Sequence, residues 1–273
     1  EAIPVQFIKS TLASYSNLLK DKIICVLSKG IETDSLKLPS QIIEDILNIK
    51  TGNINNIVSI SGPSFARDLA QRIPTGLVVA CNNDTVYQKV SEILISQETC
   101  SCESHADNIN LNKSCANCKA QIYLEFSQDI IGIQLSGAIK NVIALGIGVL
   151  EGAGYRDNSK ALFFYKSIHE IKSIIKFYNS NPASFDTLAG IGDLVLTAFM
   201  SQGRNKQLGL KIGQGHLVGN MLNNLSFVPE SLNTLKSLKQ LTDKNRLEQP
   251  LLSALYDVVY NNKSIEILIS KLC

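Results

Sequence analysis

A single charged residue stands in the middle of the most apolar stretch of this chain. Residues 131–150 read IGIQLSGAIKNVIALGIGVL, in which Lys140 carries the only charge. Burying an ammonium group is unfavourable by several kcal/mol unless the group is paired or loses its proton. A stretch of this length can cross a membrane, but a central lysine argues against that interpretation. The stretch therefore predicts a core helix with an unusual lysine.

The helical neighbours of Lys140 are small. Ser136 and Gly137 precede it by four and three residues, and Ala144 follows it by four. Residues at these spacings share a helix face, so we expect free volume around the amine. A lysine in a dry pocket can have its pKa lowered from about 10.4 toward neutrality, and it then donates and accepts protons. Lys140 is a candidate catalytic residue, and a structural lysine that snorkels from a core helix is the alternative.

Composition places the chain among globular proteins. Its 273 residues suffice for one large domain or two ordinary ones, and 45% of them are apolar against 18% charged. Such a chain can bury a sizeable core. The net charge of +2 gives no indication that nucleic acid or an anionic membrane is the main partner. No basic segment followed by an apolar run opens the chain, so no signal peptide is indicated.

Apolar runs alternate with helical segments in the first half of the chain. We expect strands at 22–27, 57–60, 75–81 and 121–126, and helices at 4–20, 40–49, 64–71 and 85–95. Largely unbroken apolar strands predict a sheet covered on both faces. The pattern is typical of a doubly wound α/β fold.

After residue 128 the strand-like runs stop. Helices are expected at 129–150, 160–178, 183–189, 192–200, 205–213, 232–241, 251–260 and 264–272. The sequence therefore predicts an α/β part over residues 1–128 and an all-helical part over residues 129–273, with the boundary near Gln128. No long linker separates the two parts, so we expect them to pack closely.

Four of the seven cysteines cluster in a polar insertion at residues 100–120. Cys100 and Cys102 form C-x-C, Cys115 and Cys118 form C-x-x-C, and His105 lies between the pairs. Such a set can close a tetrahedral zinc site, although C-x-C is the less usual spacing. The alternative is an Asn-rich surface insertion that binds no metal, and this is the interpretation we prefer.

Two further segments carry polar groups that suit an anion. Residues 61–66 (SGPSFA) run from a strand into a helix expected to open at Ser64, where free N–H groups can hold an anion. An ordinary capped turn is the alternative. Residues 201–205 (SQGRN) bring a guanidinium and an amide to a helix start, which suits phosphate, although a surface arginine shows the same pattern.

A third polar segment, residues 187–197 (TLAGIGDLVLT), has two glycines before Asp193. Asp193 is expected in the first turn of a helix, and Thr197 follows four residues later on the same face. A carboxylate at such a position often serves only as a helix cap, which is the alternative interpretation.

Taken together, these segments resemble the NAD(P)-dependent glycerol-3-phosphate dehydrogenases. The resemblance runs from Ala2 almost to the C-terminus and is interrupted by the cysteine-bearing insertion. Six motifs stand in the family's order: IPVQF at 3–7, SKG at 28–30, SGPSFA at 61–66, IGIQLSGAIKNVIALGIG at 131–148, GIGDLVLT at 190–197 and GRN at 203–205. The family fold is a Rossmann domain followed by an all-helical substrate domain, which agrees with the expected elements.

The resemblance implies an oxidoreductase that interconverts sn-glycerol 3-phosphate and dihydroxyacetone phosphate with NAD or NADP. Lys140 would exchange a proton with the C2 oxygen, Lys29 would help to polarise that oxygen, and Asp193 would orient Lys140 or the substrate. The residues implied for substrate binding are Lys29, Gly62, Ser64, Lys140, Asn141, Asp193, Thr197, Gly203, Arg204 and Asn205. Those implied for the cofactor are Phe7, Lys29, Ala66, Arg204, Val228 and Glu230. The resemblance also implies a cytoplasmic homodimer that acts in glycerol phosphate metabolism and phospholipid biosynthesis.

The sequence departs from the family pattern in its cofactor half. The family opens with a strand and a G-x-G-x-x-G turn that carries the cofactor pyrophosphate, and no G-x-G-x-x-G occurs in this chain. Residues 146–152 and 213–219 each read G-x-G-x-x-x-G, but both fall in the expected helical part. The family's V-V-E-G reads VPES at 228–231. We therefore expect an N-terminally truncated chain, either a fragment or a protein that has lost its pyrophosphate site.

Two alternatives to the dehydrogenase stand beside it at this stage. One is a non-catalytic remnant without the pyrophosphate-binding turn, which would act as a folded scaffold or dimer partner. The other is a related enzyme of the same architecture that acts on a different phosphorylated or acyl substrate, which the motifs at 61–66 and 203–205 argue against. The residue that selects NAD or NADP follows the glycine-rich turn in the family, so the sequence leaves that choice open.

Overall fold

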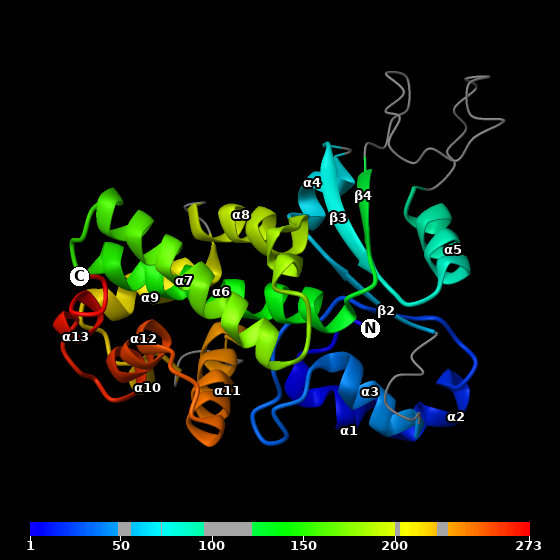
Figure 1. Ribbon diagram of the computed structural model, residues 1–273, viewed down its shortest axis with the longest axis horizontal. Coiled ribbons are helices and arrows are strands. Elements are labelled where there is room, and N and C mark those ends of the chain that lie inside the picture. The colour runs from blue at the N-terminus through cyan, green and yellow to red at the C-terminus, as the bar shows by residue number, and fades with distance from the viewer. Residues whose placement is uncertain (49–55, 72, 96–121, 200–202, 223–228) are drawn as a thin grey trace.

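The computed structural model describes residues 1–48, 56–71, 73–95, 122–199, 203–222 and 229–273. Within these residues a sheet with its helices forms one part of the molecule, and helices alone form the other (Figure 1). The strands are β1 (Ile24–Val26), β2 (Ile57–Ser61), β3 (Thr75–Ala80) and β4 (Ile122–Ser127). The helices of the first part are α1 (Ile8–Leu12), α2 (Ser16–Leu19), α3 (Pro39–Leu47), α4 (Ala66–Ala70) and α5 (Asp84–Leu94).

The strands form one mixed sheet in the order β1-β2-β3-β4. β1 pairs with β2, and β3 with β4, in parallel, whereas β2 and β3 run antiparallel with Ile60 opposite Val79. The predicted α/β class is confirmed, and the antiparallel pair is its one departure from an all-parallel sheet among the described strands. Because β1 and β2 are parallel, the segments after Val26 and Ser61 leave the sheet at the same edge.

Helices cover both faces of the sheet, as the unbroken apolar strands predict. On one face, α1 and α3 share a core with Val26 and Ile57. On the other face, α5 packs Val86 and Val90 against the strands, including Val58 of β2. Alternate residues of β2 thus contribute to two separate cores, so both faces of this strand are buried.

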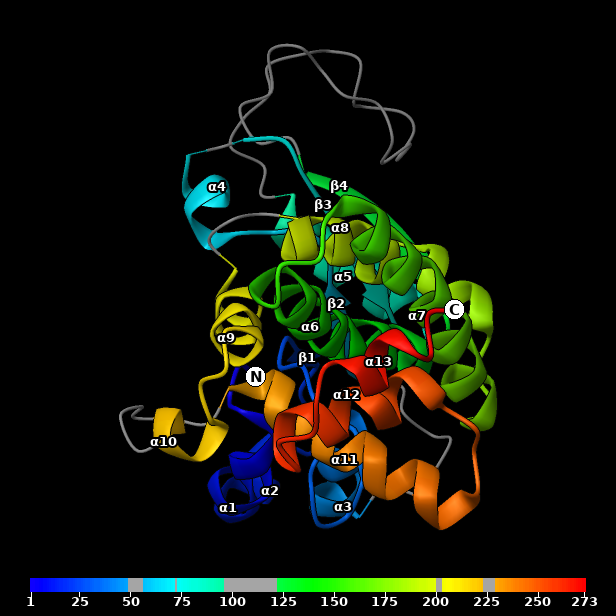
Figure 2. The same cartoon turned by 90° about the vertical axis from the view of Figure 1, so that its left-hand side faces the viewer.

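The second part of the molecule is all-helical within the described residues. It comprises α6 (Ile130–Gly152), α7 (Asp157–Phe177), η4 (Pro182–Asp186), η5 (Leu188–Gly192), α8 (Asp193–Phe199), α9 (Arg204–Gly213), α10 (Val218–Leu222), α11 (Glu230–Asn245), α12 (Pro250–Tyr260) and α13 (Glu266–Ile269). α6 is the central element, and α7, α8, α9 and α11 all pack against it (Figure 2).

The long helix α6 joins the two parts and carries Lys140. The Asp129 side chain caps it by accepting the Gly132 N–H at 2.9 Å. Every residue from 133 to 150 is buried. Of the described helices, α6 alone is long and apolar enough to span a membrane, and 94% of its apolar window is buried inside the protein. The core helix predicted from the sequence is therefore confirmed.

Helices α6 and α9 approach closely through glycines. The glycines at this contact are Gly148 and Gly152 on α6 and Gly209 and Gly213 on α9. A Cβ atom at any of them would lie 2.0–2.1 Å from a backbone oxygen of the other helix, so only glycine fits. The two helices run parallel, and the contact therefore brings the N-terminus of α9 to the middle of α6, beside Asn141.

Several predicted helix boundaries were wrong. Residues 4–20 form no single helix but the alternating short turns η1 (Val5–Phe7), α1, η2 (Ala13–Tyr15) and α2. The Ser10 hydroxyl donates to the Phe7 carbonyl at 3.1 Å, one local bond that competes with a regular helix. The helix expected at 264–272 is limited to α13, and α10 was not predicted.

The helix predicted to open at Ser64 begins two residues later, as α4. Its N-cap residue is Phe65, which offers no side-chain cap, and the Ser64 hydroxyl instead lies 3.5 Å from the Gly62 carbonyl. The expected anion site at a Ser64-capped helix N-terminus is therefore corrected to an irregular turn. The cysteine-bearing insertion, with Cys100, Cys102, His105, Cys115 and Cys118, lies outside the described residues.

Candidate active site

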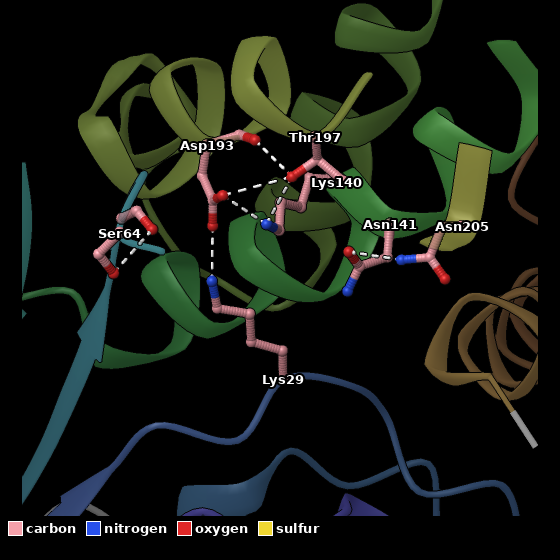
Figure 3. Close-up of polar contacts among 8 residues, drawn as sticks. Lys29, Ser64, Lys140, Asn141, Asp193, Thr197 and Asn205 are labelled. Atoms are coloured by element: carbon pink, nitrogen blue, oxygen red, sulfur yellow. Dashed lines mark hydrogen bonds and ion pairs between the residues drawn. The ribbon is translucent and has the colours of Figure 1, made fainter. Parts of the chain in front are cut away.

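Four polar side chains meet where α6 passes the start of α8 (Figure 3). Lys140 Nζ lies 2.5 Å from Asp193 Oδ1 and donates to Thr197 Oγ1 at 2.8 Å. Lys29 Nζ lies 2.5 Å from the other carboxylate oxygen, Asp193 Oδ2. One carboxylate therefore binds two ammonium groups that come from different parts of the molecule.

The chain around Asp193 is shaped to bring this carboxylate inside. The π turn η5 immediately precedes it, and Gly190 lies so close to Phe185 that a Cβ atom would be 2.1 Å from the Phe185 carbonyl oxygen. Asp193 then opens α8 and is only 3% exposed. The Thr197 hydroxyl donates to the Asp193 carbonyl at 2.7 Å, one turn later on the same face.

The amine of Lys140 can be either protonated or neutral near pH 7. Lys140 is 6% exposed. Burial and the nearby Lys29 ammonium lower the pKa of Lys140 to about 7, and the Asp193 carboxylate only partly opposes them. The free volume expected around the amine is occupied by Asp193 and Thr197. Lys140 can therefore donate or accept a proton near neutral pH.

The GRN turn lies on one side of this cluster. α9 begins at Arg204 with Gly203 as its N-cap, close to the start predicted from the sequence. Asn205 Nδ2 donates to Asn141 Oδ1 at 3.0 Å, and Asn141 directly follows Lys140 on α6. Arg204 is exposed at this helix start. The start of α9 therefore brings the Asn205 amide next to the residue that follows Lys140, and it also carries a guanidinium and free helix N–H groups, a set suited to phosphate.

The segment after β2 lies on the opposite side of the cluster. Figure 3 shows Ser64 to one side of Lys140 and Asp193, and Asn205 to the other. Gly62 has no room for a side chain, because a Cβ atom would lie 2.5 Å from the Gly76 carbonyl oxygen on β3. The site is thus a row of polar groups, with the amine of Lys140 near its middle.

Polar atoms without partners gather next to Lys29. Gly30 has a φ of +137°, and a Cβ atom there would lie 2.7 Å from Glu230 Oε2 and 3.6 Å from Thr234 Oγ1. These two oxygens, together with Ser231 Oγ, are buried without a hydrogen-bond partner among the described residues. Burial raises the pKa of Glu230 to about 7. The group fits a ligand that presents N–H donors, as a nicotinamide carboxamide does.

The structure joins only some of the predicted cofactor residues. Glu230 lies beside Gly30, the residue that follows Lys29 in the chain. By contrast, Phe7 is 58% exposed, and Ala66 is exposed at the start of α4. No described contact links Phe7 or Ala66 to Glu230. Val228 lies outside the described residues.

Sequence reasoning missed three residues at this site. Ser61, Gly30 and Thr234 were not singled out, although Ser61 and Gly30 lie inside the motifs SGPSFA and SKG. Ser61 and Gly30 could have been predicted as site residues from their positions within those motifs. Thr234 follows Glu230 by four residues, and that spacing on one helix face was its signal.

Comparison with known proteins shows which family the chain belongs to. The family model for the N-terminus of NAD-dependent glycerol-3-phosphate dehydrogenase matches residues 1–87, and the model for the C-terminus matches residues 129–270. The chain belongs to the NAD-dependent glycerol-3-phosphate dehydrogenase family. The family recognised in the sequence motifs is therefore confirmed.

Members of this dehydrogenase family from several bacteria are similar over most of the chain. Glycerol-3-phosphate dehydrogenase [NAD(P)+] of Citrifermentans bemidjiense is 31% identical over 263 residues, which cover 96% of this chain and 71% of the relative. The protein of the same name from Baumannia cicadellinicola is 32% identical over 249 residues, covering 91% of this chain and 66% of the relative.

Solved structures of glycerol-3-phosphate dehydrogenases share the fold. The enzyme from Coxiella burnetii superposes with a TM-score of 0.81 at 22% identity, covering 99% of this chain and 75% of that one. The enzyme from Saccharomyces cerevisiae gives a TM-score of 0.72 at 22% identity, covering 99% and 73%. At these identities the likeness concerns the fold, so the predicted combination of a Rossmann-type sheet and a helical part is confirmed.

Proposed function

We propose that this chain interconverts sn-glycerol 3-phosphate and dihydroxyacetone phosphate with NAD or NADP. Membership of the family supports the reaction class. The single observation that carries the proposal is the buried Lys140 amine, whose pKa is lowered to about 7 and which is paired with Asp193. Such an amine suits the transfer of a proton to and from an alcohol oxygen at neutral pH.

The residues of the central cluster divide the chemistry between them. In the oxidation direction, neutral Lys140 takes the proton of the C2 hydroxyl as the C2–H bond breaks. A nicotinamide cofactor, when bound, would supply the acceptor for the hydride from C2. In the reverse direction the Lys140 ammonium returns that proton to the C2 oxygen. Lys29 stabilises negative charge on this oxygen, and Asp193 orients both amines with Thr197 beside it.

The phosphate of the substrate is assigned to the GRN turn. Gly203, Arg204 and Asn205 open α9, and Asn141 holds Asn205 in place by a hydrogen bond of 3.0 Å. A dianion gains from the guanidinium, from the amide and from the helix N-terminus together. Binding energy from this remote group can position C2 against Lys140. Gly62 and Ser64 take the opposite end of the substrate.

The cofactor is assigned to the groups around Gly30. Glu230 and Lys29 would hold its nicotinamide end, with Phe7, Ala66, Arg204 and Val228 as further contacts carried over from the family motifs. The buried, unpaired oxygen of Glu230 supports this assignment. The glycine-rich pyrophosphate turn of the family pattern does not occur in the sequence. NAD and NADP are both compatible with the residues present.

The organisation of the protein follows from the same proposal. We assign residues 1–128 to the dinucleotide-binding part and residues 129–273 to the catalytic part, since β4 ends at Ser127 and α6 begins at Ile130. A cytoplasmic homodimer in glycerol phosphate metabolism and phospholipid biosynthesis is the setting we propose. The alternative of a non-catalytic remnant is not favoured, because a decayed protein has no reason to retain a buried carboxylate between two lysines.

An absorbance assay of the purified chain tests the function. We expect NADH or NADPH to be consumed with dihydroxyacetone phosphate. Lys140→Ala should lower kcat by about a thousandfold, because it removes the proton donor. Lys140→Arg is the matched variant: it keeps the charge but cannot release a proton near pH 7, and it should be as inactive. Circular dichroism should be unchanged in both. Turnover by Lys140→Ala within about threefold of the parent would refute the assignment.

A further inference from the structure

One buried hydroxyl at the site has no partner. Ser61 ends β2 and is 5% exposed, and its Oγ finds no hydrogen-bond partner among the described residues. Leaving a buried hydroxyl unpaired is unfavourable, and buried polar groups in folded proteins are nearly always satisfied. A hydroxyl of this kind at a ligand site is explained if the ligand completes it.

The hydroxyl of Ser61 faces α6 and the stem of Lys29. A Cβ atom built on Gly137 would lie 2.9 Å from Ser61 Oγ and 3.6 Å from Lys29 Cδ. Gly137 precedes Lys140 by three residues, so both lie on the same face of α6, and a helical side chain leans back over that preceding turn. The glycine at 137 therefore leaves space for the Ser61 hydroxyl close to the Lys140 side chain.

The direction of the substrate decides which of its groups meets Ser61. The phosphate is assigned to Arg204 and Asn205 at the start of α9, and Asn205 lies on the far side of Lys140 from Ser64 in the turn after β2 (Figure 3). With the phosphate there and the C2 oxygen at the Lys140 amine, the remaining carbon points toward the turn that begins at Ser61. In glycerol 3-phosphate and in dihydroxyacetone phosphate, that carbon carries the C1 hydroxyl.

We propose that Ser61 is a substrate-contacting residue whose hydroxyl binds the C1 hydroxyl of the substrate and makes the site selective for it. This inference rests on the proposed function. Lys29 takes part, because its stem and the Ser61 hydroxyl lie beside the same glycine, Gly137, while its ammonium binds Asp193. The Lys29 ammonium then serves the C2 oxygen of the substrate, and the Ser61 hydroxyl serves the C1 hydroxyl. The unpaired hydroxyl then gains its partner.

The test compares two substrates in two proteins. Hydroxyacetone phosphate has the ketone and the phosphate of dihydroxyacetone phosphate but a methyl group in place of the C1 hydroxymethyl. In Ser61→Ala we expect kcat/KM for dihydroxyacetone phosphate to fall about tenfold, and that for hydroxyacetone phosphate to change by less than about twofold. The KM for the nicotinamide cofactor should stay the same. The preference for the natural substrate therefore shrinks about tenfold.

Ser91→Ala is the matched control. Ser91 is also a buried hydroxyl without a described partner, but it lies on α5, which packs on β3 and β4 away from Lys140. Ser91→Ala should leave kcat/KM unchanged for both substrates. Equal losses for both phosphates in Ser61→Ala, no loss for either, or a raised KM for the cofactor would overturn the role of Ser61. A parent protein that fails to reduce dihydroxyacetone phosphate would instead defeat the proposed function, and the inference with it.

Discussion

Lys29 and Lys140 bind opposite oxygens of a single carboxylate, each at 2.5 Å from Asp193. Two ammonium groups this close repel one another, and Asp193 can compensate only one full charge. The ammonium that is buried more deeply loses its proton more easily. The side chain of Lys140 is 7% exposed, against 26% for Lys29. Deep burial beside a second ammonium explains why the pKa of Lys140 is lowered to about 7.

The pH dependence of turnover should report Lys140 directly. Its pKa is lowered to about 7, so the amine is neutral above that value and protonated below it. Oxidation of glycerol 3-phosphate needs the neutral amine, and its kcat/KM should rise with pH through about 7 and then level off. Reduction of dihydroxyacetone phosphate needs the ammonium, and its kcat/KM should fall above about 7. Profiles measured in both directions should therefore be mirror images, and a rise in both would contradict the role of Lys140.

Removing the second lysine should move this titration. The Lys29 charge lowers the pKa of Lys140, so Lys29→Met should shift the rising limb of the oxidation profile to higher pH. The profile is measured on the residual activity of the variant. Lys172→Met is the control, since Lys172 pairs with Asp186 in a more exposed position and should leave the limb unmoved. A limb that stays in place, or moves to lower pH, would show that the two amines are not coupled.

Loss of the shared carboxylate should weaken the fold. Asp193→Asn keeps the shape but leaves two ammonium groups without their compensating charge, and we expect the free energy of unfolding to fall by about 3 kcal/mol. Urea unfolding below pH 7, where Lys140 is charged, measures it. Asp186→Asn, at a surface pair whose side chains are 33% and 46% exposed, should lose less than about 0.5 kcal/mol. Similar losses in the two variants would argue against a special role for Asp193.

The guanidinium at the start of α9 should act on binding rather than on chemistry. Arg204→Ala should raise KM for dihydroxyacetone phosphate by about 30-fold, the scale of a lost charge-assisted hydrogen bond, and should change kcat far less. Lys211→Ala removes a cation from the last turn of the same helix and should leave KM unchanged. A fall in kcat at constant KM would place Arg204 in the chemical step instead.

The glycine contact between α6 and α9 should tolerate no side chain. Gly209→Ala would put a methyl group 2.1 Å from the Leu145 carbonyl oxygen, and we expect a loss of about 3 kcal/mol or more in thermal or urea unfolding. Gly219→Ala is the counterpart, because a Cβ atom at Gly219 in α10 meets nothing within 4 Å. That variant should be neutral or gain up to about 1 kcal/mol from helix propensity. Equal stability of the two variants would contradict the close approach.

Local chemistry made part of this structure predictable. A lone charge in an apolar run predicts a buried amine, and Lys140 is buried as predicted. The strands at 57–60 and 75–81 were placed within one residue by their apolar runs. The start of α9 at Arg204, directly after Gly203, lies within one residue of the start expected from the sequence. In each case the determining interactions lie within a few residues of one another along the chain.

What could not be predicted depends on contacts between distant segments. The apolar residues of β2 and β3 do not indicate that these two strands pair antiparallel. Ser64 looked like a helix cap, but capping depends on the path of the chain after Pro63, and the helix starts after Phe65. Lys29 and Asp193 are 164 residues apart, and only the resemblance to a family, not the residue pattern, brought them together.

The glycine contact between α6 and α9 also restricts how the site can move. If α9 slid along α6, backbone atoms would collide, and if it moved away, a void would open between the helices. We therefore expect the GRN turn and the backbone that carries Lys140 to move as one rigid unit. We therefore expect any adjustment on substrate capture in the segments that leave the sheet, namely the loop that carries Lys29 and the turn with Gly62 and Ser64. In that case one side of the site stays fixed while the other adjusts to the substrate.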